Sequence, residues 1–473
     1  MEPRTDDAPR SLPEGGGPRG LWAEGVEVAG SAVAAMHPRR LLLGLLLLLL
    51  LVETGRTYDR ITEPRFGPAG LLAADPAADR ATSLEALLAS IGSQTARSEE
   101  PAKVLGVIEA EVRRLGEVAS TASDDAARKA AIATLAEIER LRPRGTFEAT
   151  SAAVAESYGG FVRAVITLRG RDAAESLGTV LFRVPWSIWR HDRMFLIGVG
   201  VPSLVLLGIF GGMLARIAAC RFARRQWLSV SDAADFAASS ALRLVSAPFL
   251  PVIAALVPLG VAALLGLLLQ VPLVDAVGGI AFGVPLALSL FAAILLLGLL
   301  ASSLLVIPAV TCEDADAADA LQRAYACLFN QPLRLLGLVV VGLISLAIGT
   351  AVVDGVAVVT LGLASSSLAV STPDWVPAAI GSRGWLEFGG GGAKIDLLLA
   401  PWSATAISVW CTLARWLVGA YVLAWIFDGG VRIYLFLRQA TDGTRPEEIA
   451  PARGRVPQGD RIAEAIDAAR RAR

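Results

Sequence analysis

The sequence predicts an all-α, polytopic membrane protein with about six transmembrane helices. The chain has 473 residues, of which 54% are apolar and only 18% charged, and its mean hydropathy of +0.57 lies far above that of a soluble domain. Uncharged apolar stretches long enough to cross a hydrocarbon core of about 30 Å recur along the chain. The charged residues cluster between these stretches, and their pattern predicts two interfacial amphipathic helices and a soluble helical bundle between spans 1 and 2.

The N-terminal part predicts a tail followed by a short anchor. Residues 1–38 are rich in Gly, Pro, Glu and Arg with little periodicity, which is typical of a disordered tail. Residues 39–52 follow as a short membrane anchor helix. Its leucine-rich part, Leu41–Val52, reaches only about 18 Å as a helix, so it is the weakest span. The run also resembles a signal peptide starting at Met36, but no small-residue cleavage site follows, which favours an uncleaved anchor.

Residues 53–194 form the main polar segment and predict a soluble, extracytoplasmic helical bundle. Apolar residues at helical spacing predict helices that begin near residues 98, 124 and 147. At the end of the segment, Trp186 and Trp189 predict an interfacial lead-in to the next span, because tryptophan favours the headgroup region.

Residues 195–438 predict the transmembrane domain. Its expected spans are about 195–219, 249–274, 276–310, 333–353 and 403–438. A Gly- and Ser-rich stretch between residues 355 and 392 predicts a loop after the fourth of these spans. With six spans, the arginines at residues 39–40, 221–225 and 432–438 all fall on one side. The positive-inside rule then puts both termini, including the polar tail 439–473, on the cytoplasmic side of the membrane.

Two stretches between spans, 231–248 and 315–332, predict duplicated interfacial helices. The aspartates of the first, Asp232 and Asp235, lie 84 residues before Asp316 and Asp319 of the second, and each stretch ends near a proline that precedes an apolar run. This spacing predicts an internal repeat. Asp319 and Arg323 are four residues apart, which predicts an ion pair on an exposed helix face.

An acidic group precedes the second interfacial helix. Glu313, Asp314, Asp316 and Asp319 lie close together in the sequence, where negative charge favours a helix start. A cation site is the alternative, but the spacing fits no fixed set of ligands. A capped, solvated helix start is therefore the favoured interpretation.

Several stretches of the second half resemble a family of uncharacterised bacterial multi-pass membrane proteins. The resemblance covers roughly residues 195–448 and is patchy in 53–194. It is carried by the runs Gly211–Ala219, Pro248–Pro251, Glu313–Asp314, Asp319–Ala320, Arg323–Tyr325, Asn330–Pro332, Ile433–Arg438, Asp442–Thr444 and Glu447–Glu448. It implies a shared helical membrane fold and a place in the bacterial cytoplasmic (inner) membrane, and it brings no known activity.

Ionisable residues in or next to spans are the candidate site residues, because burying a charge in lipid is costly and usually has a reason. Asp428 and Arg432 are four apart and are expected to pair near the inner end of the last span. Asp354 is expected to end a span, and Arg415 interrupts the last apolar run. A structural role is favoured over a transport role. The full candidate set is Arg216, Asp316, Asp319, Arg323, Asp354, Arg415, Asp428 and Arg432.

Two functional classes remain open after the enzymes are set aside. The chain has only two histidines, and its four cysteines have no metal-ligand spacing, so we expect no catalytic residues, no cofactor and no metal. The net charge of −1 argues against a nucleic-acid partner. The favoured class is a non-enzymatic membrane component that binds or organises partners, its contacts being the lipid bilayer and a membrane or extracytoplasmic protein. The alternative is a carrier built on the duplicated unit of amphipathic helix plus span.

Overall fold

The computed structural model describes residues 20–91, 110–115, 118, 125–268, 282–371, 380 and 402–448. Within these ranges the chain is helical and contains no strand beyond an isolated bridge between Phe66 and Arg144. Among the described residues, six helices are long and apolar enough to cross a membrane, which confirms the predicted all-α polytopic class. They are α3 (Pro38–Ile61), α11 (Val201–Arg224, with its helical lead-in from Arg193), α13 (Ala241–Leu268), α15 (Gly283–Glu313), α17 (Pro332–Ala369) and α20 (Trp402–Asp442).

The prediction of a disordered tail over residues 1–38 is wrong for its second half. Helices α1 (Leu21–Ala29) and α2 (Ser31–Ala35) pack against α17 and α20. Gly25 lies beside Val341, and Gly30 lies beside the guanidinium of Arg432, so small residues bring these helices close to the spans. Glycine is frequent in disordered chains, but it also allows two helices to approach closely, and here it has this second role. Residues 1–19 lie outside the described residues.

The anchor predicted at 39–52 is longer than its leucine run. Helix α3 has 24 residues, or about 36 Å at 1.5 Å per residue, and is therefore long enough to cross a bilayer. The polar residues from Glu53 to Ile61 continue the helix, because helical hydrogen bonding does not stop where the apolar run ends.

The other span boundaries also shift. Helix α13 already begins at Ala241, and α17 continues through the predicted loop to Ala369, so Asp354 lies inside a helix and does not end one. The predicted spans 249–274 and 276–310 overlap with α13 and α15, although residues 269–281 lie outside the described residues. The last helix extends to Asp442, four residues past the predicted end, and a 3₁₀ turn, η6 (Pro446–Glu448), follows; the remaining tail from 449 is outside the description.

Two short helices occupy the positions of the predicted interfacial pair. Helix α12 (Val230–Ser239) ends nine residues before the predicted end at 248, because Ser240 separates it from α13 and Pro248 lies within that long helix. Helix α16 (Ala317–Asn330) matches the second prediction closely. It buries Ala320, Ala324 and Cys327 on one face.

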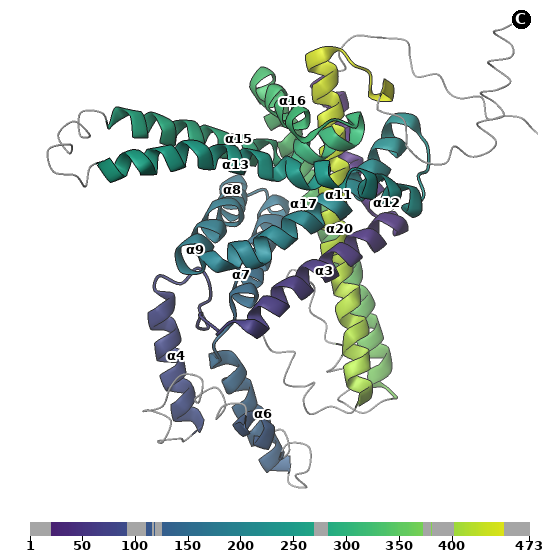
Figure 1. Cartoon of the computed structure of the whole chain (residues 1–473). Helices are drawn as coiled ribbons and strands as arrows, with labels where there is room; N and C mark the ends of the chain where they lie inside the picture. Colours follow the sequence, from purple (N-terminus) through teal and green to yellow (C-terminus); the bar gives the residue numbers. More distant parts are fainter. Residues whose placement is uncertain are drawn as a thin grey trace, which may run out of the picture.

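The long helices diverge from one common region. Helices α13 and α15 pack side by side and extend to the left in Figure 1, while α17 and α20 extend downward. Both pairs meet where α12 and α16 lie, and α11 contacts α15 and α20 there. Small residues permit the close contacts: a Cβ on Gly211 would lie 2.2 Å from the Phe427 ring, and one on Gly44 2.5 Å from the Ala420 carbonyl oxygen.

The polar segment divides into two parts. Helices α4 (Pro76–Ile91) and α6 (Asp125–Leu141) form an arm that projects away from the spans in Figure 1, and residues 110–115 pack with them and belong to the arm. The arm has its own small apolar core of Leu87, Leu115, Ala131, Leu135 and Ile138. Helix α7 (Thr146–Ile166) instead packs against α3 and α17. It is followed by α8 (Gly170–Gly178), the π-helical turn η2 (Thr179–Arg183) and α9 (Val184–His191). The predicted single bundle over 53–194 is therefore wrong in part, since α7 packs against two of the spans and lies outside the apolar core of the arm.

Candidate functional site

Paired charges, most of them buried or half-buried, gather where the long helices meet. They lie at the starts of α3, α13 and α17, at the ends of α15 and α20, and on the short helices α1 and α16. We call this set the charged layer. It comprises Glu24, Arg40, Arg243, Glu313, Asp314, Arg323, Arg334, Asp428, Arg432 and Arg438. Four carboxylates thus face six guanidinium groups. The layer has an excess of positive charge.

Asp428 is the centre of the most buried part of the layer. Its carboxylate accepts from Arg40 on one oxygen and, at 2.9 Å, from Arg432 Nε on the other. The side chains of Arg40 and Asp428 are only 4% and 2% exposed. The predicted pair between Asp428 and Arg432 is therefore formed, and the sequence reasoning missed its third member, Arg40. Arg432 also donates to the Glu27 carbonyl oxygen at 2.6 Å, which fastens α1 to α20.

Two further pairs fix the starts of α17 and α13. Arg334 pairs with Glu24 of α1, whose side chain is 1% exposed, with Arg334 Nε 3.0 Å from the carboxylate. Arg243 pairs with Asp314 at 2.9 Å and donates to the Asp314 carbonyl oxygen at 2.7 Å.

The three arginines at these helix starts occupy the same place in their helices. Arg40, Arg243 and Arg334 are the third residues of α3, α13 and α17. A cation is disfavoured at the positive end of a helix dipole, so a carboxylate beside it removes an unfavourable interaction. Each arginine here has such a carboxylate.

Glu313 organises the end of α15. Its carboxylate accepts from Arg438 Nε at 2.8 Å, and Arg323 and the Tyr434 hydroxyl also contact it. The predicted pair between Asp319 and Arg323 is therefore wrong: Arg323 pairs with the buried Glu313, where the less polar surroundings strengthen the attraction. The acidic group is thus divided between ion pairs at Glu313 and Asp314 and the exposed residues Asp316 and Asp319 at the start of α16.

The remaining candidates lie apart from these pairs. Arg216 of α11 is 1% exposed, donates to the Thr311 carbonyl oxygen at 2.6 Å and lies over the Phe236 ring. Arg415 of α20 is 7% exposed and donates to the Ile380 carbonyl oxygen at 2.7 Å. Asp354, 8% exposed, lies within α17. The charged layer includes Arg323, Asp428 and Arg432 from the candidate set but not Arg216, Asp354 or Arg415.

His37, just before α3, lies at the edge of the charged layer. Burial lowers the pKa of its imidazole, and the positive charges of Arg40, Arg39 and Arg221 lower it further. The ring is therefore uncharged at neutral pH, which suits its contact with the Trp227 ring at a centroid distance of 4.7 Å.

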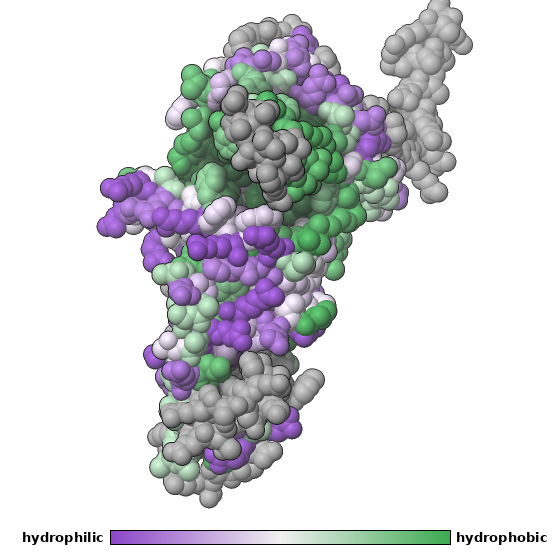
Figure 2. Space-filling view, turned by 60° about the vertical axis from the view of Figure 1, so that its left-hand side comes forward, coloured by the Kyte–Doolittle hydropathy of each residue, from purple (hydrophilic) through white to green (hydrophobic). Residues whose placement is uncertain are grey.

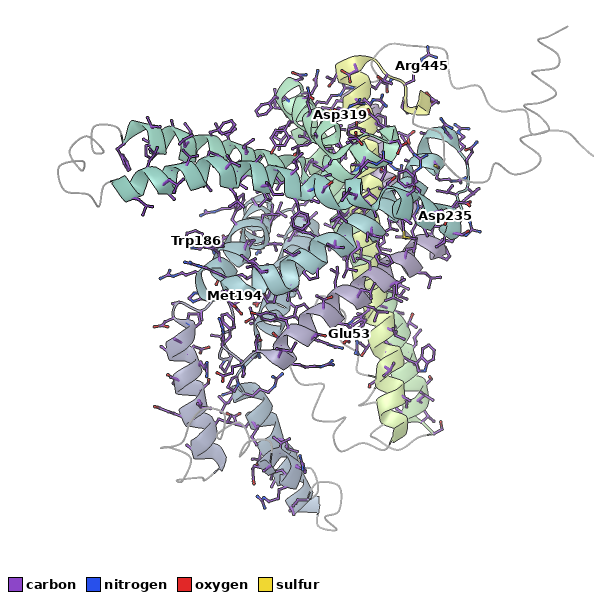
Figure 3. All side chains as sticks on the ribbon, in the orientation of Figure 1. Glu53, Trp186, Met194, Asp235, Asp319 and Arg445 are labelled. Carbon is purple, nitrogen blue, oxygen red and sulfur yellow. The ribbon has the colours of Figure 1, made fainter. Side chains whose placement is uncertain are left out.

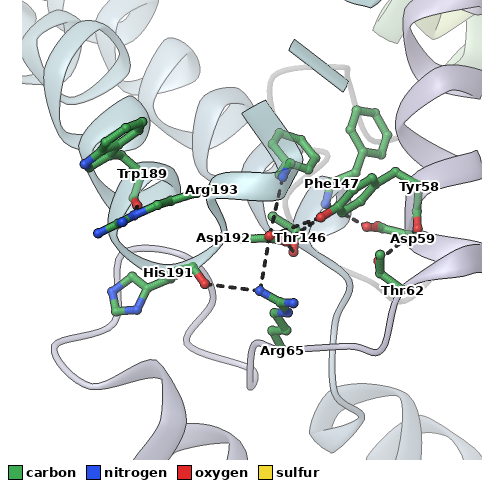
Figure 4. Close-up of polar contacts among 11 residues, drawn as sticks. Tyr58, Asp59, Thr62, Arg65, Thr146, Phe147, Trp189, His191, Asp192 and Arg193 are labelled. Carbon is green, nitrogen blue, oxygen red and sulfur yellow. Dashed lines mark hydrogen bonds and ion pairs between the residues drawn. The ribbon is translucent and has the colours of Figure 1, made fainter. Parts of the chain in front are cut away.

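A second polar cluster joins the other end of α3 to the polar segment (Figure 4). Asp192, with a fully buried side chain, accepts from the Tyr58 hydroxyl at 3.0 Å and from Thr146 Oγ1 at 2.8 Å, and it pairs with Arg65 at 3.1 Å. Asp59 accepts from two backbone N–H groups at the start of α7, each at 2.9 Å. This cluster holds α7 and α9 to the end of α3. Sequence reasoning missed this cluster, because its members are single polar residues far apart in the chain.

The geometry of both clusters is that of structural ion pairing. Most of the carboxylates pair with guanidinium groups, and hydroxyl and backbone N–H groups supply further hydrogen bonds. Among the described residues no group of three or more histidine, cysteine, aspartate and glutamate side chains could hold a metal ion. Fold and site together define a polytopic helical membrane protein whose helix ends are fastened by buried charges. The chain matches no family model, no curated protein and no solved structure, so the resemblance to bacterial multi-pass proteins stays a prediction.

Proposed function

We propose that the chain is a non-enzymatic membrane scaffold that presents its polar arm to a protein partner. The observation that supports this is that the charged side chains fall into two groups with different surroundings. Those in the charged layer are engaged between helices and fasten helix ends. The arm instead carries exposed charges away from the spans, such as Arg113 and Arg140, and the partner of Arg140 is the partly exposed Glu137 of its own helix. A buried, paired charge is poorly placed to bind a partner.

We further propose a bacterial cytoplasmic membrane with both termini on the cytoplasmic side. The excess of arginine in the charged layer favours that side for this end of the spans under the positive-inside rule. The arm, beyond the other end of α3, then lies outside the cytoplasm.

An internal repeat is part of this proposal. The observed starts of α12 and α16 change the alignment of the two copies from an offset of 84 residues to one of 87. Ser229 caps α12 and Asp316 occupies the cap position of α16, which are 87 residues apart, so Asp232 corresponds to Asp319 rather than to Asp316. Each short helix precedes a long helix with arginine as its third residue. Helices α1 to α3 follow the same order with Arg40, which supports a third copy.

The partner is tested by purification from native membranes in mild detergent, with mass spectrometry of the proteins that accompany the full chain. We expect a stoichiometric protein partner. The variant Arg113→Glu/Arg140→Glu should lose it, because two exposed positive charges of the arm become negative. The matched variant Arg39→Glu/Arg445→Glu, with the same change at the charged-layer end, should retain it.

The opposite result would favour the carrier. A chain that purifies without any protein partner in all three forms, and that retains a solute, would overturn the scaffold. The observation that supports a carrier is that two ionisable side chains, Asp354 of α17 and Arg415 of α20, are buried within long helices.

A further inference from the structure

The face of η2, α9 and α10 (Arg193–Phe195) that points away from the protein combines aromatic and cationic side chains. Phe182, Trp186 and Trp189 are 55%, 66% and 51% exposed. Arg183, Arg190 and Arg193 are exposed between and beside them. We call these six residues the α9 face. Figure 3 labels Trp186 on α9 and Met194 on α10, on the flank away from α17 and α20.

The opposite side of α9 is already occupied by core contacts. Val184 and Ile188 pack with Phe195 against Phe66 and Leu71, and Ser187 Oγ donates to the Leu71 carbonyl oxygen at 2.7 Å. The helix therefore cannot turn its tryptophans inward. A surface helix in water usually buries one apolar face and exposes a polar face. Helix α9 buries its apolar face and also exposes large aromatic side chains beside arginines.

The exposed face carries uncompensated positive charge. Within the part of the chain that the structure describes, Arg183, Arg190 and Arg193 form no ion pair. The adjoining carboxylate, Asp192, points inward and is engaged by Tyr58 and Arg65 (Figure 4). Arg193 lies 5.1 Å from the centre of the Trp189 ring, and its Nε donates to the Trp189 carbonyl oxygen at 3.3 Å, so its positive charge is held beside this tryptophan with no described carboxylate to pair with it.

The position of this face is the boundary of a membrane span. Helix α9 leads directly into the apolar helix that begins at Arg193, at the end of the spans opposite to the charged layer. In Figure 2 the apolar surface over α13 and α15 gives way to a mostly hydrophilic band beneath it. Tryptophan concentrates at such boundaries, and arginine near a bilayer surface is attracted to anionic lipid.

We propose that the α9 face lies on the bilayer surface and binds the phosphate groups of anionic phospholipids. The three arginines donate charge-assisted hydrogen bonds to phosphate oxygens, and Phe182, Trp186 and Trp189 enter the boundary between headgroups and acyl chains. The continuity of this face with the membrane-spanning surface, together with its charge, favours lipid over a protein partner. This goes beyond the scaffold, since it assigns a ligand to a surface distinct from the arm.

The test uses the full chain in nanodiscs of phosphatidylcholine that contain a minority of brominated lipid. Bromine quenches the fluorescence of tryptophans next to it, so greater quenching by brominated phosphatidylglycerol than by brominated phosphatidylcholine measures local enrichment of the anionic lipid. For the unaltered chain we expect this excess of quenching by brominated phosphatidylglycerol. Enrichment should be on the order of fivefold for each arginine.

Three variants locate the excess. Trp186→Phe/Trp189→Phe should remove most of it, because the reporters next to the bound lipid are gone. Arg183→Gln/Arg190→Gln/Arg193→Gln should remove it with all tryptophans present. The matched variant Arg113→Gln/Arg114→Gln/Arg140→Gln, which loses the same charge on the arm, should retain it.

Several outcomes would overturn the proposal. They are no excess in the unaltered chain, an excess that survives Trp186→Phe/Trp189→Phe, and an excess that the arginine variant leaves unchanged. A second copy of the chain could cover the α9 face instead. The unaltered chain would then show no lipid preference and two chains per disc, and the arginine variant would show one chain per disc.

Discussion

Asp428 is the residue on which the charged layer depends most. One carboxylate serves two arginines from different helices, and all three side chains are at most 11% exposed. Moving an ion into such surroundings is costly, and removing one partner of a buried pair leaves the other charge without compensation. The layer is therefore more sensitive to loss of Asp428 than to loss of any exposed charge.

The variant Asp428→Asn tests this directly. The amide keeps the shape of the side chain and loses its charge, so Arg40 and Arg432 remain buried with no anion between them. We expect the free energy of unfolding to fall by about 3–5 kcal/mol. The measurement is the midpoint of unfolding of the purified chain in detergent.

Asp319→Asn is the matched control, because Asp319 is exposed on α16 and forms no ion pair among the described residues. Its effect should stay within about 0.5 kcal/mol. Equal effects of the two substitutions would contradict a structural role for the buried pair.

Close packing of α3 on α20 depends on Gly44. An added Cβ there would lie 2.5 Å from the Ala420 carbonyl oxygen, and backbone cannot move aside as a flexible side chain does. Gly44→Ala should therefore separate the two helices and cost about 1–3 kcal/mol, as overpacking does elsewhere. The yield of monodisperse protein and its thermal midpoint both report the change.

Gly355→Ala provides the comparison on another span. Nothing lies within 4 Å of the Cβ it would add on α17. The substitution should be neutral or slightly stabilising, since alanine favours a helix over glycine. If Gly44→Ala were equally harmless, the contact between α3 and α20 would not be the close one described.

The elements differ in how far the sequence predicts them. Apolar runs located all six spans, because crossing lipid requires a helix with apolar sides, although the first run is short and Arg415 interrupts the last. Their ends were misplaced where polar residues continue a helix, as at Glu53–Ile61 and after Asp354. Helices α1 and α2 were missed because small residues that pack tightly resemble those of flexible chains.

The candidate site was predictable only where its partners are neighbours in sequence. Asp428 and Arg432 are one helical turn apart, and their pair was foreseen. Arg40 lies 388 residues from Asp428, so no local pattern could join them. Arg323 had a neighbour of opposite charge in Asp319, yet it pairs with Glu313, because folding brought a more buried carboxylate within reach.

For the whole molecule, the charged layer and the arm must lie on opposite sides of the membrane if α3 crosses it. Helix α3 begins in the charged layer at Arg40 and ends at Tyr58, beside the Asp192 cluster that holds the polar segment. The four native cysteines are buried, so a cysteine placed on the surface provides a clean reporter. Ala133 on α6 and Asp319 on α16 are both exposed.

We therefore expect a membrane-impermeant maleimide, added to intact spheroplasts, to label Ala133→Cys and to leave Asp319→Cys unlabelled until the membrane is opened. The unaltered chain is the control for background. Labelling of both positions in intact cells would mean that α3 does not cross the bilayer, and the charged layer would then lie on the same side as the arm. Reversed labelling would keep the crossing and invert the proposed orientation, placing the excess arginine of the charged layer outside, against the positive-inside rule.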